Sequence, residues 1–98
     1  MGGKLEASDK KLISYDSDCD ILFVHSGYGS DEKFKGNFDV GDIVLDVSNK
    51  GKVREIEVIN ASEYLELNTD ILNHLTDFEF QVNQHKNRIG ITLVLIAD

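Results

Sequence analysis

The segment YDSDCDILFV, residues 15–24, places an acidic loop between two apolar stretches. Leu12–Tyr15 precedes the loop, and Ile21–His25 follows it. Asp side chains favour tight turns because they accept hydrogen bonds from nearby backbone amides. The pattern predicts two neighbouring antiparallel strands, and the second, almost wholly apolar, is expected to be an inner strand covered on both faces.

Three further stretches have the alternation of β-strands. In Lys33–Val40, the apolar residues at 34, 38 and 40 fall on one side, which predicts a half-buried strand. Ile43–Val47 and Val53–Ile59 flank Ser48–Gly51, whose Asn and Gly tolerate the left-handed conformations that hairpin turns need. A β-hairpin over residues 43–59 is therefore predicted.

The period changes from strand to helix after residue 60. Asn60 and Glu63 have the spacing of a capping box, which predicts a helical turn beginning there. Thr69 is predicted to cap a second short helix, with Asp70 in its first turn and an apolar stripe at residues 71, 72 and 75.

The chain ends in a second predicted hairpin, formed by a strand around Phe78–Val82 and a final strand at Arg88–Ile96. The final strand becomes apolar on both faces, and such a strand at an open edge promotes aggregation. It is therefore expected to be central or buried in a dimer interface. The whole pattern predicts an α+β, mainly β fold: an antiparallel β-sheet of about six to seven strands, with one or two short helices between the fifth strand and the C-terminal hairpin.

Length and charge limit the number of domains and the kinds of partner that the protein can have. The 98 residues predict a single domain, 1–98, with residues 1–10 as a flexible tail. No apolar run reaches the length of a membrane span, so we expect a cytoplasmic protein without a membrane partner. The net charge of −8 is concentrated in residues 16–32 and 61–80, which contain no Lys or Arg. This distribution disfavours nucleic acid and favours a basic protein partner.

Five segments, taken in order, form a recognisable set: Tyr15–Asp16, Asp20–Val24, Ile43–Asp46, Gly51–Val53 and Ile56–Ser62. This set resembles the small prokaryotic domain of unknown function 2283 family. The resemblance covers residues 12–75, and the closing hairpin at 78–96 is similar to the longer members. It implies a fold type without an assigned activity, and it brings no catalytic residue and no cofactor.

The acidic loop is the candidate metal site. Asp16, Asp18 and Asp20 have the spacing of the first three ligands of a calcium loop. Such loops also need Gly at the sixth position and a bidentate Glu at the twelfth, where this chain has Ile21 and Gly27. The favoured alternative is that Asp16 and Asp20 order the turn by accepting backbone N–H groups.

Other reactive side chains lack the partners that chemistry requires. Carboxylates next to Cys19 disfavour its reactive thiolate. His25 is expected to be partly buried and bonded to a backbone group, and the other two histidines, His74 and His85, to lie on the surface. Asp46 is expected to cap the hairpin turn at Ser48–Gly51 rather than to point inward.

Glycines in Ser26–Ser30 would allow an anion-binding nest, but Asp31 and Glu32 would repel phosphate, so a flexible loop is expected.

The resulting hypothesis is a non-catalytic interaction or scaffold module that forms homodimers. One alternative is a metal-dependent or small-ligand enzyme using the Asp16, Asp18 and Asp20 loop. Another is an antitoxin-like acidic partner of a basic protein.

Overall fold

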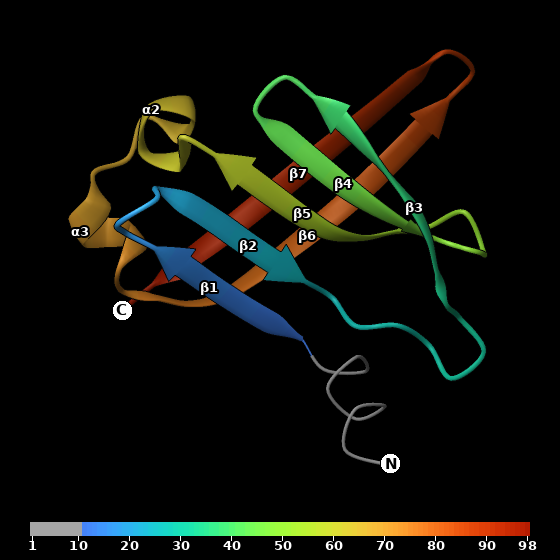
Figure 1. Cartoon of the computed structure of the whole chain (residues 1–98), viewed down its shortest axis with the longest axis horizontal. Helices are drawn as coiled ribbons and strands as arrows, with labels where there is room; N and C mark the ends of the chain where they lie inside the picture. The colour runs from blue at the N-terminus through green and yellow to red at the C-terminus, as the bar shows by residue number, and fades with distance from the viewer. Residues whose placement is uncertain (1–10) are drawn as a thin grey trace.

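The computed structural model describes residues 11–98. The predicted N-terminal tail, residues 1–10, lies outside this part of the chain. Strands and short helices follow one another as Figure 1 shows, in the order β1 (Leu12–Asp16), β2 (Ile21–His25), β3 (Phe34–Val40), β4 (Ile43–Ser48), β5 (Val53–Ile59), α2 (Ala61–Leu65), α3 (Thr69–Leu72), β6 (Leu75–His85) and β7 (Arg88–Ala97).

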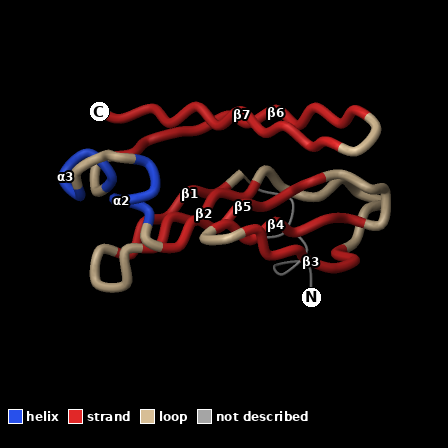
Figure 2. Tube along the Cα trace, turned by 90° about the horizontal axis from the view of Figure 1, so that it is seen from above, coloured by secondary structure: helices blue, strands red, loops and turns tan. Residues whose placement is uncertain are grey.

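The strands form two layers (Figure 2). The first is an antiparallel five-stranded sheet in the order β1-β2-β5-β4-β3. The second is the β6–β7 hairpin, which lies across one face of that sheet, while α2 and α3 connect the layers at one end. The predicted α+β, mainly β class is confirmed, including two short helices between the fifth strand and the C-terminal hairpin. The division of the strands into two sheets is new.

The core lies between the layers, because alternate residues of each strand point to the same face. Neighbouring pairs in the sheet, such as Leu22 with Val58 and Val24 with Ile56, meet Phe78 from the hairpin. The buried apolar residues are Leu22, Val24, Leu45, Ile56, Val58, Ala61, Leu72 and Phe78. β2 is an inner strand as predicted, but Ile21 and Phe23 on its other face are only partly buried, so the expected cover on both faces is wrong.

The predicted burial of β3 is also wrong. Phe34, Phe38 and Val40 are 54%, 51% and 61% exposed. The physical reason is position: β3 is an edge strand of the first sheet, and the two-stranded second layer is too narrow to cover all five strands. A register shift between Phe34 and Gly36 further separates the first of these side chains from the other two.

The helix caps differ from those predicted. Asn60 adopts a left-handed conformation and makes no side-chain cap, so the proposed capping box with Glu63 is wrong. Asp20 replaces it from a distant turn, since its carbonyl accepts the Ala61 N–H at 2.9 Å. At α3 the capping side chain is Asn68, which accepts the Ile71 N–H at 3.0 Å, and Thr69 is the first helical residue.

The last strand is not central. β7 pairs with β6 on one side, and within residues 11–98 no strand pairs with its other side. The expectation of a central strand is therefore wrong, and its alternative, a dimer interface, is taken up below.

Candidate functional site

Asp20 is the centre of a hydrogen-bonded cluster that joins β1 to the start of α2. Its carboxylate accepts the Tyr15 hydroxyl at 2.6 Å and the Ser62 hydroxyl at 2.7 Å, as well as the Ser62 N–H at 3.0 Å. The bonds from Tyr15 and Ser62 lower the pKa of Asp20, and the bond to Asp20 raises the pKa of Tyr15 to about 12. Asp20 therefore remains a carboxylate that accepts from both hydroxyl groups, which describes a structural latch rather than a base beside a nucleophile.

Asp16, at the start of the acidic loop, stabilises the turn of this loop. Asp16 Oδ1 accepts the N–H groups of Asp18 and Cys19 at 3.0 and 3.2 Å. Two of the three candidate calcium ligands, Asp16 and Asp20, thus accept backbone N–H groups of the chain, which is the alternative that the sequence favoured. Within residues 11–98, no cluster of three or more His, Cys, Asp or Glu side chains is arranged to hold a metal ion. Cys19 is exposed, and the charge of Asp16 is the main cause that raises the pKa of its thiol.

A second carboxylate cluster lies on the opposite face of the sheet from the core. His25 Nδ1 lies 3.1 Å from Glu55 Oε1, and His25 is only 6% exposed, so a carboxylate side chain is one partner of this buried ring. Asp46 lies opposite Glu55 in the β4–β5 register. Burial, followed by the hydrogen bond with Asp46, raises the pKa of Glu55 to about 7.

The expectation that Asp46 caps the hairpin turn is therefore wrong. Ser48 does so instead, since its hydroxyl accepts the N–H groups of Lys50 and Lys52 at 3.1 and 3.4 Å. Sequence reasoning missed the pairing of Asp46 with Glu55. A signal existed, because the predicted hairpin over residues 43–59 brings these two positions toward each other across the turn.

The loop between β2 and β3 contains a buried carboxylate, that of Glu32, which accepts hydrogen bonds from other residues of the protein. Glu32, whose side chain is 4% exposed, accepts the Gly29 N–H at 2.7 Å and the Ser48 hydroxyl at 2.8 Å. Arg54 contacts it through Nη2 at 2.6 Å and Nε at 3.1 Å. The bond from Arg54, followed by that from Gly29, lowers the pKa of Glu32 to about 2. The glycine-rich loop thus binds an internal carboxylate, a role that sequence reasoning did not find.

The two other histidines are exposed, as expected. The His74 ring follows α3 and lies with its Nδ1 2.7 Å from the carbonyl oxygen of Asp70 in that helix.

An apolar groove runs along the unpaired side of β7, between this strand and the β3–β4 end of the first sheet. It consists of two adjoining pockets of about 300 and 380 Å³, which share Ile43 and Ile91. We call it the β7 groove; its lining residues are Phe38, Asp39, Val40, Ile43, Leu45, Ile56, Val58, Tyr64, Leu65, Ile89, Ile91 and Leu93. Four large side chains in it are at least half exposed, and Asp39 is its one charged member.

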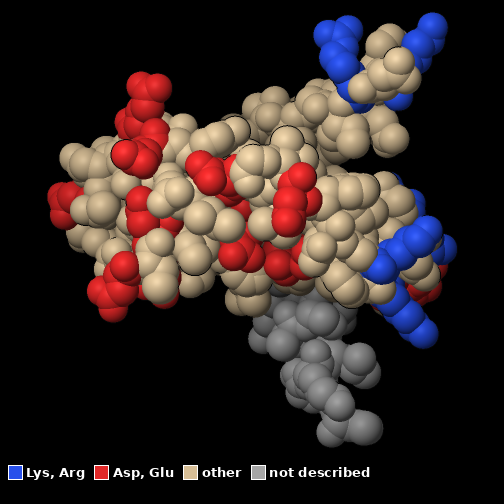
Figure 3. All heavy atoms as spheres, turned by 45° about the horizontal axis from the view of Figure 1, so that its top comes forward, with Lys and Arg blue, Asp and Glu red and all other residues tan. Residues whose placement is uncertain are grey.

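Charge is segregated along the molecule (Figure 3). Asp and Glu spread over one end and the middle of the face shown, whereas Lys and Arg gather at the other end. The sequence explains this pattern, because Lys33, Lys35, Lys50, Lys52, Arg54, Lys86 and Arg88 belong to turns and strand ends at that side of the fold. Within residues 11–98, no helix is long and apolar enough to cross a membrane.

Comparison with known proteins places the chain. Residues 12–62 match the family described as protein of unknown function (DUF2283). The chain belongs to this family.

Two relatives of the DUF2283 chain come from archaea. An uncharacterized protein of Methanocaldococcus jannaschii is 37% identical over 87 residues, which cover 88% of this chain and 72% of that protein. A protein of Methanosarcina mazei named "Putative hypoxanthine phosphoribosyltransferase" is 28% identical over 79 residues, covering 81% of this chain. The match spans 62% of that relative's length. No solved structure matches the chain at the significance of these relatives.

The cluster around Asp20 lies within the range that matches the family. Its three members are Tyr15, Asp20 and the distant Ser62. These residues therefore join the first layer to α2. In the β7 groove, the exposed residue Ile89 lies outside the matched range, whereas Phe38 and Val40 lie inside it.

Proposed function

We propose that the protein is a non-catalytic interaction module that self-associates, with two copies joined through the free edge of β7. The observation that carries this proposal is the β7 groove. Phe38 and Ile89 on its two walls are 51% and 52% exposed, which leaves a continuous apolar surface beside an unpaired strand. Contiguous exposed apolar surface of this kind marks interaction sites, because its burial drives association.

The character of β7 distinguishes it from the other free edges. β1 has five residues, and β3 carries Lys35, Asp39 and a register shift. β6 has a register shift after Leu75 and acidic residues beyond it. Short length, charge and irregular register are devices that prevent edge pairing. β7 has ten residues, and Arg88 at its start is its one charged residue, so it is the edge best suited to accept another strand.

A second copy fits this edge better than an unrelated strand. If two β7 strands pair, each copy's hairpin extends the second layer of the other over the β7 groove. The exposed side chains of Phe38 and Val40, which line the groove, would then be covered by apolar residues of the partner's hairpin. One self-complementary patch closes into a twofold dimer, which is the commonest form of soluble homo-oligomer.

Charge favours the antiparallel arrangement. β7 begins beside Lys86 and Arg88, and it ends beside Asp98 and opposite Asp77. In an antiparallel pair, the basic end of each hairpin meets the acidic end of the other. Complementary potentials of this kind fix register and orientation.

The experiment is light scattering coupled to size-exclusion chromatography. We expect the full chain to elute with twice the mass of one chain, and Phe38→Asp to elute as a monomer, because it places a charge in the groove. Phe34→Asp is the matched control, since Phe34 lies on the same strand, is 54% exposed and does not line the groove. A monomeric wild type, or equal disruption by both variants, would contradict the proposal.

Three sequence-based expectations stay predictions: a cytoplasmic location, the absence of nucleic-acid binding and a basic protein partner. The acidic end of the molecule supports the last of these electrostatically (Figure 3). A metal-dependent enzyme at the Asp16–Asp20 loop is not favoured, because Asp16 and Asp20 are already occupied by internal donors.

A further inference from the structure

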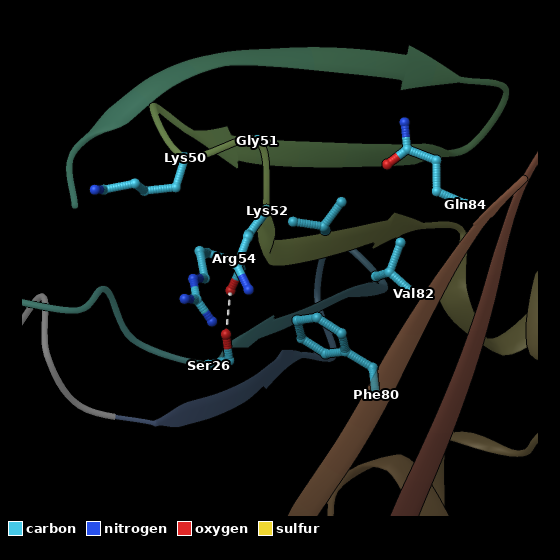
Figure 4. A pocket seen from close by; sticks show the side chains of 9 residues that line it. Ser26, Lys50, Gly51, Lys52, Arg54, Phe80, Val82 and Gln84 are labelled. Atoms are coloured by element: carbon cyan, nitrogen blue, oxygen red, sulfur yellow. Dashed lines mark hydrogen bonds between the residues drawn. The ribbon is translucent and has the colours of Figure 1, made fainter. Parts of the chain in front are cut away.

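A separate pocket lies on the β6 side of the hairpin, away from the β7 groove (Figure 4). It has a volume of about 460 Å³ and opens between the β4–β5 turn and the inward face of β6. This volume is typical of small-molecule sites. The lining residues are Ser26, Lys50, Gly51, Lys52, Val53, Arg54, Phe80, Val82 and Gln84. We call it the basic pocket.

One wall of the basic pocket is apolar and flat. Phe80 and Val82 come from β6, and Val53 faces them from β5. The Phe80 ring is held in place by stacking on Phe78, with ring centroids 6.0 Å apart and an angle of 15° between planes. Because Phe78 is fully buried, the Phe80 ring is a supported surface on which a planar group can pack.

The opposite wall carries positive charge on an acidic protein. Arg54 is engaged by the buried Glu32, so this ion pair stiffens the wall but offers no net charge. Lys50 and Lys52 remain at the mouth, and both are exposed. The Lys50 ammonium lies 3.2 Å from Asp31, but this carboxylate is 77% exposed and such surface pairs exchange readily. The two ammonium groups are thus available to an incoming anion.

We propose that the basic pocket binds a small molecule that joins a flat apolar body to an anionic group. The apolar body packs on Phe80 and Val82, and the anionic group lies at the β4–β5 turn, where Lys50 and Lys52 supply positive charge. Figure 4 shows Phe80 and Val82 on one side of this space and Arg54 on the other, with Lys50 and Lys52 at the β4–β5 turn and the Lys50 side chain directed away from Phe80. The site uses β6 and the β4–β5 turn, so it does not depend on pairing through β7 and is distinguishable from the proposed self-association.

The test uses 8-anilinonaphthalene-1-sulfonate, which has a flat apolar body and one sulfonate, together with its uncharged relative N-phenyl-1-naphthylamine. Fluorescence titration gives the affinities, and amide chemical shifts of labelled full-length protein locate the probe. We expect the sulfonate to bind more tightly, with shifts concentrated at residues 50–54 and 80–84. Shifts confined to the β7 groove, or equal affinity for both probes, would overturn the proposal.

Matched charge removal sharpens this test. Lys50→Gln with Lys52→Gln should weaken sulfonate binding about tenfold, because the two substitutions remove both exposed positive charges at the mouth of the pocket. Lys33→Gln with Lys86→Gln removes the same charge outside the pocket and should leave the affinity nearly unchanged. Equal weakening by both pairs would reduce the effect to overall charge and overturn the assigned site. The dispersion of the amide spectrum verifies that each variant folds.

Discussion

The two layers of this protein are held in different ways. The five-stranded sheet is tied at its ends by polar clusters around Asp20 and Glu32, each built from residues distant in sequence. The hairpin is held on the sheet mainly by apolar side chains, above all Phe78. A polar link between layers, Lys11 to Asp77 at 2.9 Å, is about half exposed and therefore contributes little.

This difference shows which part of the fold has a fixed geometry and which part leaves surface uncovered. Hydrogen bonds are directional, so the polar clusters specify one arrangement of turns and helices within the first layer. Apolar packing is less directional, and the hairpin covers only part of the face beneath it. The surface features that favour binding, the β7 groove and the basic pocket, lie along the two sides of that hairpin.

The largest expected effect comes from removing the apolar attachment of the second layer. Phe78→Ala should lower the free energy of unfolding by about 3–5 kcal/mol, because it leaves a cavity between layers. Chemical denaturation at fixed protein concentration measures the change. Phe34→Ala, at an exposed aromatic residue, should change stability by no more than about 0.5 kcal/mol. Similar losses in both variants would show that packing of the hairpin does not dominate.

A smaller loss is expected when the latch of the first layer is broken. Asp20→Ala removes the acceptor for Tyr15 and Ser62 and leaves Ala in a left-handed conformation with φ of 57°. Its melting temperature should fall by less than that of Phe78→Ala. Asp16→Ala, which removes only turn contacts from an exposed side chain, is the control and should fall least. If Asp16→Ala were the more damaging change, the latch would not be the main tie.

The smallest effect is a dependence on pH that arises on the outer face of the first layer. The folded protein raises the pKa of Glu55 from 4.5 to about 7, so the folded state holds this proton more tightly than the unfolded chain. The resulting stabilisation is complete below pH 4.5 and is lost as the pH rises through 7. Glu55→Gln should therefore be more stable than the wild type at pH 8, by on the order of 1 kcal/mol after solvent screening.

Thermal unfolding between pH 4.5 and 8 checks this sign. Glu79→Gln on the hairpin removes the same charge away from Asp46 and serves as the control. A wild type that gains stability relative to Glu55→Gln as the pH rises would contradict the raised pKa.

Local pattern predicted most of the elements. The hairpin over residues 43–59 was predictable because its alternation and turn residues lie within one short segment. The same holds for the number of strands and the position of the helices. The family resemblance at Tyr15, Asp20 and Ser62 was visible in the sequence, although their mutual contact was not.

Several of the errors share one cause, since each of these depended on a partner in another segment of the chain. The cap of α2 comes from Asp20 rather than from the neighbouring Glu63. Asp46 lies beside Glu55 instead of capping the adjacent turn. The exposure of Phe38 reflects how far a separate hairpin extends over the sheet, which periodicity does not contain.

The sequence alone determined the strands, the turns and the excess of negative charge, because these follow from side-chain alternation, backbone preference and composition. The tertiary structure decided which side chains meet. It places the Asp20 carboxylate next to hydrogen-bond donors and the Glu55 carboxylate next to other acidic side chains. It also leaves one edge of the second layer unpaired. These outcomes depend on strand order and on the crossing of two layers. Both are fixed by packing between segments far apart in the chain, which no local pattern encodes.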